Sequence, residues 1–277
     1  MKPSIFVFTE AEAADTPTLA YAAALAKPLG ATLRLLHVLS LPAVAELEYD
    51  VPLLDAAYLP AVRAALTRAI AGLSVPATVE LLEDDWHAGL DQLLATHHPA
   101  LLVAGLTATT GPLDEWLSNR VLTLAHRTGY PLLLVPEHLP VAAQRPPRRM
   151  LLAVEDHPFR LTPPGRALAP VLAKLGCAVL PATVFPPHAS AGRGEAARRA
   201  VQHCGLSATL AHEELRHILH ENPAAGIWQA ADELSADWVA LLDQGHGWLH
   251  KVFSGSVIAD VLRYSQVPVL LLPVASE

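Results

Sequence analysis

Cysteine is nearly absent from this sequence, which has two in 277 residues, Cys177 and Cys204. Two cysteines provide neither a disulfide framework nor a zinc-binding pattern, which favours a reducing compartment and a core role for both thiols. No apolar run approaches the roughly 20 residues of a membrane span. The short apolar stretch Ile5–Phe8 runs into Glu10 and Glu12, unlike a signal peptide. We therefore expect a cytoplasmic protein with no membrane partner.

Positive charge is also scarce, since 19 Lys and Arg against 27 Asp and Glu give a net charge of -8. This balance argues against a nucleic acid partner bound through phosphate neutralisation. Hydrophobic residues make up 52% of the chain and charged residues 17%, as in globular proteins. The length is enough for one large domain or two mid-sized domains, each with its own core.

Several catalytic motifs are missing. There is no Walker A loop, no GxSxG elbow and no paired-carboxylate spacing typical of acid–base catalysis. We therefore expect no catalytic residues and no enzyme. His246 and His250 are four apart and His217 and His220 three apart, so each pair could share a helix face and hold a metal. Neither pair has a third ligand at a suitable spacing, so we predict surface histidines, no metal site and no required cofactor.

The chain contains an internal repeat. Pro131–Pro136 (PLLLVP) matches Pro268–Pro273 (PVLLLP) at an offset of 268 − 131 = 137, and no gap is needed from Asp85 onward. Further upstream, Ile5–Thr9 matches Leu151–Glu155 at an offset of 151 − 5 = 146. A repeat of about 140 residues has the size of a whole domain.

Two homologous domains are therefore predicted, at residues 1–137 and 148–277, joined by a proline- and arginine-bearing linker near His138–Arg149. The last strands of the two domains are short, apolar and flanked by proline, so an exposed edge there would favour association.

Strands alternate with helices in both repeats. In the first repeat we expect strands at Ile5–Thr9, Thr32–Leu39, Val75–Leu82, Leu101–Gly105 and Pro131–Val135. We expect its helices at Thr16–Leu29, Ala61–Leu73, Trp86–His97 and Glu115–Arg127. In the second repeat we expect strands near Met150–Val154, Ala178–Val184, Ala208–Ala211, Trp238–Leu242 and Val269–Leu272. This pattern predicts an α/β fold, with a parallel sheet between two helical layers and ligands bound beyond the carboxyl ends of the strands.

The most informative loop follows the strand Trp238–Leu242. Gly245 lets backbone amides approach a ligand without a Cβ in the way, and Gly255 and Ser256 precede a helical pattern. A helix start offers unpaired N–H groups to an anion. A strand-to-helix turn whose glycines serve geometry alone is the alternative.

With this loop and the order of its elements, the chain resembles the tandem universal stress protein family. That family's domain is a five-stranded, adenine nucleotide alpha hydrolase-like α/β fold with the signature Gly-x2-Gly-x9-Gly-Ser/Thr. The second repeat matches three of the four positions, with Leu242 in place of the first glycine before Gly245, Gly255 and Ser256. The resemblance implies that the last strands pair between the domains to form an internal pseudo-dimer; a further homodimer is left open.

The first repeat matches the signature less well, since it keeps Gly105 but has Ala108, Ser118 and Asn119 at the other positions. Ala108 and Ser118 add side-chain atoms where the backbone would contact phosphate. Acidic residues in the same loop repel phosphate. We therefore interpret the first domain as a degenerate, structural half.

The resemblance also implies which residues bind. In nucleotide-binding members of the family, an acidic residue ends the first strand and a valine of the second strand flanks the adenine. In the second domain the implied cofactor-binding residues are Glu155, Val184, Leu241, Gly245, Gly255, Ser256 and Val257. They imply a stress-response protein that acts by binding and regulation, with ATP or another adenine nucleotide as its ligand. The alternative is a structural or protein-interaction module with both pockets degenerate, in which the connections Leu41–Pro60 and Pro186–Glu195 serve as partner surfaces or ligand lids.

Overall fold

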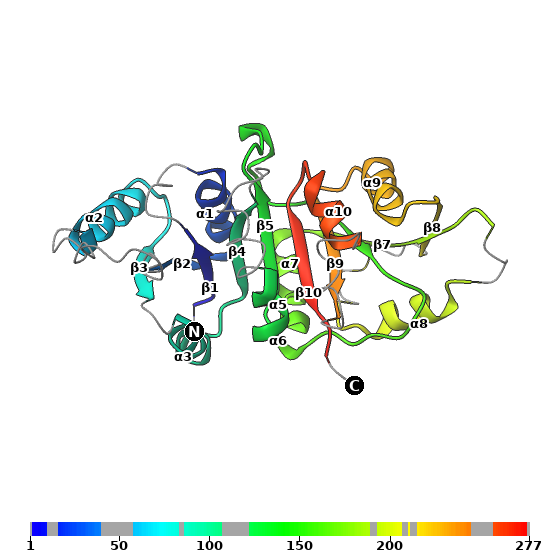
Figure 1. The fold of residues 1–277 in the computed structure, drawn as a ribbon, viewed down its shortest axis with the longest axis horizontal. Helices are drawn as coiled ribbons and strands as arrows, with labels where there is room; N and C mark the ends of the chain where they lie inside the picture. Colours follow the sequence, from blue (N-terminus) through cyan, green and yellow to red (C-terminus); the bar gives the residue numbers. More distant parts are fainter. Residues whose placement is uncertain are drawn as a thin grey trace, which may run out of the picture.

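The computed structural model describes residues 2–9, 16–39, 58–82, 86–106, 122–188, 193–206, 210, 215–244 and 257–275 (Figure 1). The strands are β1 (Ser4–Phe8), β2 (Thr32–Val38), β3 (Ala77–Leu82), β4 (Leu101–Leu106), β5 (Leu132–Pro136), β6 (Arg149–Ala153), β7 (Ala178–Phe185), β8 (Arg216–Leu219), β9 (Trp238–Asp243) and β10 (Val269–Pro273). The helices are α1 (Pro17–Leu29), α2 (Tyr58–Ala71), α3 (Trp86–His97), α5 (Leu122–Thr128), the short 3₁₀ turn η2 (Val141–Ala143), α6 (Pro163–Arg166), α7 (Ala169–Leu175), α8 (Glu195–His203), α9 (Pro223–Glu233) and α10 (Val257–Arg263).

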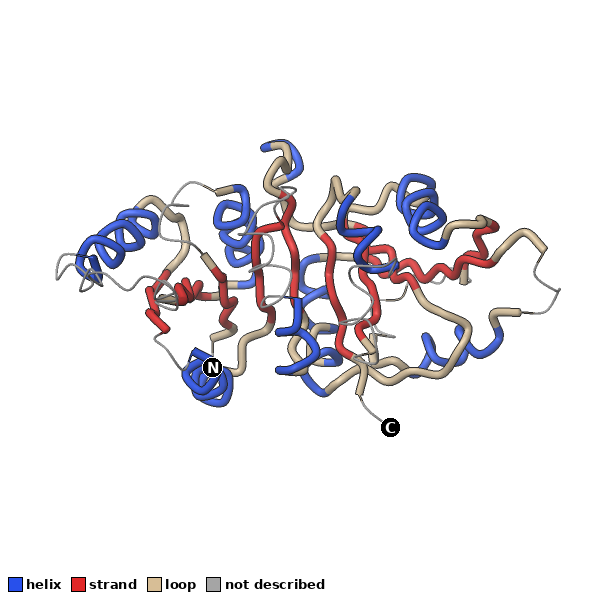
Figure 2. Tube along the Cα trace, in the orientation of Figure 1, coloured by secondary structure: helices blue, strands red, loops and turns tan. Residues whose placement is uncertain are grey.

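All ten strands form one sheet, in the order β3-β2-β1-β4-β5-β10-β9-β6-β7-β8 (Figure 2). Neighbouring strands within β1–β5 are parallel, and so are those within β6–β10. Each half therefore has the same five-stranded order, with its first strand beside its fourth. The α/β fold class predicted from the sequence is confirmed.

The two halves meet where β5 and β10 pair antiparallel, with Leu270 opposite Leu133. These two leucines are also repeat equivalents, since 270 − 133 = 137. Val269 faces Leu134 and Leu271 faces Leu132, so the ladder is symmetric about the Leu133–Leu270 pair. A pseudo-two-fold axis therefore passes between these two side chains, as in an isologous dimer interface. The predicted internal pseudo-dimer is confirmed.

The sheet is covered by helices on both faces. Successive strand residues point to opposite faces, so Ile5 and Val7 enter one core while Phe6 and Phe8 enter the other. The core that contains Ile5 also takes residues of α1, α7 and α8. The second core takes residues of α3, α5, α9 and α10. This burial explains why the strands are apolar along both faces.

Among the described residues, side-chain hydrogen bonds join the halves away from the β5–β10 ladder, one of them from Thr162 Oγ1 to the carbonyl of Gly129 at 2.6 Å. The buried Trp238 Nε1 donates to the hydroxyl of Tyr21 at 2.6 Å. Lys174 Nζ donates to the last carbonyl of α1, that of Leu29, at 2.7 Å, where a cation suits the helix end. The repeat equivalent of Trp238 is Leu101, which has no polar side-chain atom, so the Tyr21 bond has no symmetric copy.

Of the predicted strand Ala208–Ala211 the structure describes only Leu210, which forms a single parallel bridge with Val179 of β7; the other three residues lie outside the described residues. A strand that the sequence analysis did not predict, β8 at Arg216–Leu219, also pairs with β7. Its residues are largely exposed because it lies at the edge of the sheet, so it lacks the apolar signature of the other strands. The described part of the predicted helix Glu115–Arg127 is α5.

Candidate functional site at the carboxyl edge of the second half

The topology of the second half creates a crevice at the carboxyl ends of β6 and β9. From β6 the chain moves outward to β7 and β8 and then returns to β9, on the other side of β6. In open α/β sheets ligands bind at such a switch point, outside the carboxyl ends of the strands. Ala153 pairs with Leu241 at the end of this ladder, so the residues that follow each strand meet there.

Polar side chains connect the two loops across this crevice. Gln244 follows β9, and its amide nitrogen lies 2.7 Å from Nε2 of His157, which follows β6. Nδ1 of the same ring lies 3.4 Å from a carboxylate oxygen of Glu155. Asp243, at the end of β9, is fully buried.

The four described members of the predicted site occupy the loop after β6, strands β7 and β9, and the start of α10. Glu155 lies at the crevice with its side chain 77% exposed, and Leu241 is buried in β9. Val184, in β7, packs against α9, where a Cβ on Gly226 would lie 2.5 Å from its Cγ1. Val257 is the first residue of α10 and is partly exposed.

The remaining three members, Gly245, Gly255 and Ser256, lie outside the described residues. The structure therefore brings Glu155 and Leu241 to neighbouring strands and places Val184 on the next strand. It leaves the glycine loop itself as a prediction.

Asp156 has a role that the sequence did not reveal. Its carboxylate accepts hydrogen bonds from the backbone N–H groups of Gly194 at 3.0 Å and Ala197 at 3.3 Å, at the start of α8. The Gly194 N–H, followed by that of Ala197 and the charge of Arg193, lowers the pKa of Asp156 below its ordinary value. The amino end of α8 is thus already occupied by an anion from the chain itself. The signal in the sequence was the acidic pair Glu155-Asp156 directly after a strand.

Aromatic contacts surround the same end of β7. The guanidinium of Arg193 lies 4.8 Å from the ring centroid of Phe185, a cation–π geometry. The ring of His217 meets Phe185 edge-on with centroids 5.6 Å apart. His217 belongs to strand β8, so the expectation that His217 and His220 share a helix face is wrong. No group of three or more potential metal ligands occurs among the described residues, and His246 and His250 lie outside them.

The equivalent edge of the first half has different chemistry. Thr9 takes the position of Glu155, and its carbonyl accepts from His37 Nδ1 at 2.9 Å. A Cβ on Gly105 would lie 3.1 Å from Oγ1 of Thr18 in α1. The absence of a side chain at Gly105 therefore lets α1 pack closely against the end of β4. In the second half Leu242 stands at the equivalent position and packs, partly buried, against the core.

The fold and the switch-point crevice define a doubly wound α/β protein made of two like halves. Residues 147–273 match the model of the universal stress protein family. The second half is therefore a universal stress protein domain. No curated protein matches the chain.

Solved structures extend the fold to the whole chain. A universal stress protein from Archaeoglobus fulgidus DSM 4304 is similar at a TM-score of 0.65 and 17% identity, over 99% of this chain and 97% of that one. A functionally unknown protein from Pseudomonas aeruginosa PAO1 is similar at a TM-score of 0.59 and 17% identity, over 98% and 92%. A putative universal stress protein from Pseudomonas aeruginosa UCBPP-PA14 is similar at a TM-score of 0.55 and 17% identity, over 98% and 93%. The whole chain, with both of its halves, thus has the same fold as these solved universal stress proteins. Among the described helices none is long and apolar enough to cross a membrane.

Proposed function

We propose that this protein is a stress-response protein whose second half binds an adenine nucleotide, with ATP as the first candidate. In this proposal the chain divides into domains at residues 1–137 and 148–277. The nucleotide occupies the β6–β9 crevice, and the protein acts by binding and regulation without turnover. The site consists of Glu155, Val184, Leu241, Gly245, Gly255, Ser256 and Val257.

The observation that carries the proposal is the asymmetry of the family match. The family model matches residues 147–273, and this half keeps Gly245, Gly255 and Ser256. The first half, outside that match, has Ala108 and Ser118 at two of these positions. The described geometry is compatible with the site, because α10 begins at Val257, directly after Ser256. A glycine loop that leads into a helix start suits an anionic ligand.

A second candidate function is a protein-interaction module that takes no nucleotide. The charge at the crevice favours it, because Glu155, Asp156 and Asp243 place three carboxylates there. Negative charge opposes a phosphate ligand. The start of α8 is filled by Asp156 and offers no free N–H pair to a phosphate.

Ligand-dependent stability separates the two candidates. With micromolar affinity, millimolar ATP raises the free energy of unfolding by roughly 4 kcal/mol, because ligand binds only the folded state. We expect a corresponding rise in melting temperature for the wild type and its loss in Gly255→Glu. The matched control is Ser118→Glu, at the equivalent position of the first half, which should keep the full shift.

Absence of any shift with millimolar ATP, ADP or AMP would exclude the nucleotide function in favour of the interaction module. A shift that survives Gly255→Glu would mean that nucleotide binds elsewhere in the chain.

A further inference from the structure

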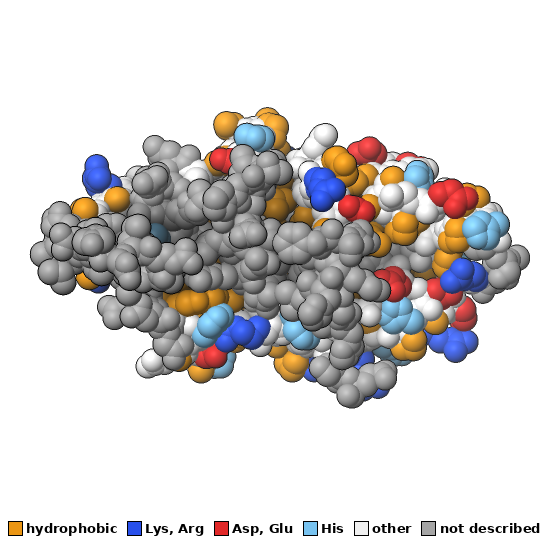
Figure 3. All heavy atoms as spheres, viewed as in Figure 1, with side chains coloured by type: hydrophobic (Ala, Val, Ile, Leu, Met, Phe, Trp, Pro, Cys, Tyr) orange, Lys and Arg blue, Asp and Glu red, His pale blue; other side chains and the backbone are white. Residues whose placement is uncertain are grey.

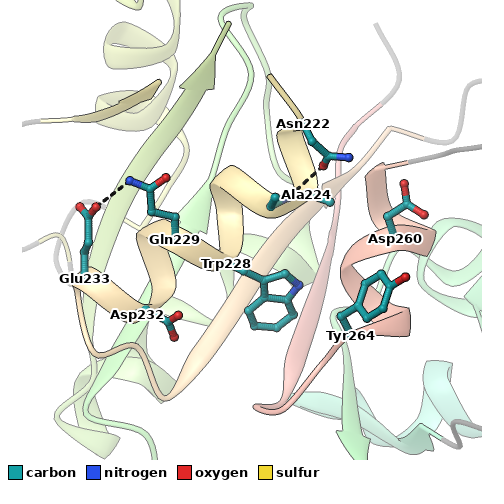
Figure 4. Close-up of a pocket in the computed structure, with 9 residues that line it drawn as sticks. Asn222, Ala224, Trp228, Gln229, Asp232, Glu233, Asp260 and Tyr264 are labelled. Atoms are coloured by element: carbon teal, nitrogen blue, oxygen red, sulfur yellow. Dashed lines mark hydrogen bonds between the residues drawn. The ribbon is translucent and has the colours of Figure 1, made fainter. Parts of the chain in front are cut away.

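A groove lies between α9 and α10, on the helical face of the second half and apart from the proposed nucleotide loop (Figure 4). It has a volume of about 690 Å³, within the range of ligand-binding clefts. Trp228 and Asp232 of α9 line it four residues apart, a spacing that puts both on one helix face. Asp260 of α10 and Tyr264, which directly follows that helix, line it from the other side, so each side contributes an aromatic ring and at least one carboxylate.

The internal repeat provides a direct comparison. At the offset of 137, Trp228 corresponds to Asp91 of α3 and Tyr264 to Arg127 of α5. In the first half these two residues form an ion pair, in which Arg127 Nη1 lies 3.1 Å from both carboxylate oxygens of Asp91. The junction of the first half is therefore bridged by opposite charges. The second half has two aromatic residues instead, and the junction is hollow.

The charges around the groove are one-sided. Glu233 adds a third carboxylate to those of Asp232 and Asp260. Arg263 pairs with one of these carboxylates, since its Nη1 lies 3.9 Å from Asp260, but its side chain is 66% exposed. Acidic and apolar side chains reach the surface over α9 and α10, together with a basic side chain over α10 (Figure 3). A cationic occupant is favoured, and an anionic nucleotide is not.

The aromatic residues add two further preferences. Tyr264 is 66% exposed, a large apolar side chain left uncovered beside three carboxylates. A cation above an aromatic ring is attracted by its π electrons. The indole N–H of Trp228 is buried without a hydrogen-bond partner in the described part of the chain, and its nitrogen is on the side that faces Tyr264 (Figure 4). Such a donor is satisfied by an acceptor such as a peptide carbonyl.

We propose that the α9–α10 groove is a docking surface for a lysine- or arginine-bearing peptide segment of a protein partner. The cationic side chain lies against Tyr264 and between Asp232 and Asp260. A backbone carbonyl of the segment accepts from Trp228. This site is independent of nucleotide binding and goes beyond the function proposed above.

The test uses the full chain and a fluorescein-labelled nonapeptide of alternating lysine and alanine, with fluorescence anisotropy in low salt. The matched peptide has glutamate in place of lysine. We expect saturable binding of the lysine peptide and none of the glutamate peptide. Tyr264→Arg places the cation of the first half into the groove and should weaken binding by roughly tenfold or more. Trp228→Phe keeps a ring but removes the N–H and should weaken binding by roughly three- to tenfold.

Two surface variants control for general charge and for folding. Asp232→Asn with Asp260→Asn removes two carboxylates from the groove and should weaken binding about tenfold. Glu195→Gln with Asp91→Asn removes two carboxylates elsewhere and should leave affinity within about twofold. Circular dichroism checks that each variant is folded.

Equal weakening by the groove pair and the control pair would overturn the proposal, since nonspecific attraction would then explain binding. Absence of lysine-peptide binding would overturn it as well. Spermidine that binds as tightly as the peptide and competes with it would also overturn the proposal, because the site would then recognise a free polyamine.

Discussion

The two halves of this chain keep the same buried framework but differ at their helix junctions and carboxyl edges. At the centre of the sheet, the repeat-related residues Leu133 and Leu270 are identical and face each other. At the α3–α5 junction an Arg127–Asp91 ion pair joins the helices, whereas Tyr264 and Trp228 leave a groove between α10 and α9. The pair on the pseudo-two-fold axis is thus the same in both halves, whereas the Trp238–Tyr21 contact and the helix junctions differ between them. The second half, which matches the family model, also has the open groove.

The symmetric part of this comparison is tested most strongly by truncating Leu133 and Leu270, the two residues that face each other at the pseudo-two-fold axis. Leu133→Ala and Leu270→Ala each remove a fully buried side chain and should each lower the free energy of unfolding by about 2–5 kcal/mol. Because both lie at the pseudo-two-fold axis, the two costs should agree within about 0.5 kcal/mol. Urea denaturation measures them, with Val141→Ala, 82% exposed, as the control that should change little. If the two losses in unfolding free energy differed by several kcal/mol, strands β5 and β10 would not be energetically equivalent at the seam where they pair.

The asymmetric hydrogen bond between the halves comes next in expected size. Tyr21→Phe leaves the buried N–H of Trp238 without its acceptor, which should cost about 1–3 kcal/mol at neutral pH. A double-mutant cycle with Trp238→Phe isolates the bond, because the pair is in direct contact. Additive single costs would mean that the hydrogen bond contributes nothing beyond packing.

The variant Tyr21→Phe also tests how the free energy of unfolding changes at alkaline pH. Burial raises the pKa of Tyr21 above its ordinary value of 10.0, and burial raises the pKa of Cys177 from 9.0 to about 12. The folded protein therefore keeps protons that the unfolded chain releases. The stability they contribute is fully present below about pH 9 and is lost as pH rises further. Denaturation curves at pH 7 and pH 10.5 should show this loss, with a smaller loss in Tyr21→Phe. An equal loss in the variant would mean that Tyr21 does not take part.

The smallest effect is expected at the junction of the first half. Arg127→Ala should cost only about 0.2–1 kcal/mol, because the Arg127 and Asp91 side chains are 31% and 58% exposed and the ion pair is screened by salt. Added salt near 1 M should remove most of this cost, as measured by thermal denaturation. A cost above 2 kcal/mol that persists in salt would mean that packing of Arg127 on Trp86, whose ring centroid lies 5.9 Å away, holds the junction.

The sequence predicted the fold well wherever apolar periodicity and the repeat agreed. Helix α3 occupies the predicted range Trp86–His97, and nine strands lie close to their expected positions. The failure at β8 has a physical cause, since the strand Arg216–Leu219 is a polar edge strand that buries little. The repeat alone would have predicted β8 correctly, because adding the offset of 137 to the range of β3, Ala77–Leu82, gives residues 214–219.

The candidate site was less accessible from sequence. The crevice follows from strand order, which the resemblance implied. The Asp156–Gly194 contact joins residues 38 apart, and the Gln244–His157 contact joins residues 87 apart. No local pattern encodes such contacts, because they depend on how two loops meet after the sheet has formed. The groove likewise required the facing positions of two helices.

The β5–β10 seam also decides how this protein responds to dilution. Two separate chains joined by such a seam come apart when their concentration falls below the dissociation constant, and their apparent stability falls with it. Here a short linker connects the two partners, so each half meets the other at an effective concentration on the order of millimolar, whatever the amount of protein in the cell. The seam therefore stays closed even in a sparsely expressed protein, and the carboxyl edge and the α9–α10 groove of the second half are always presented together with the first half.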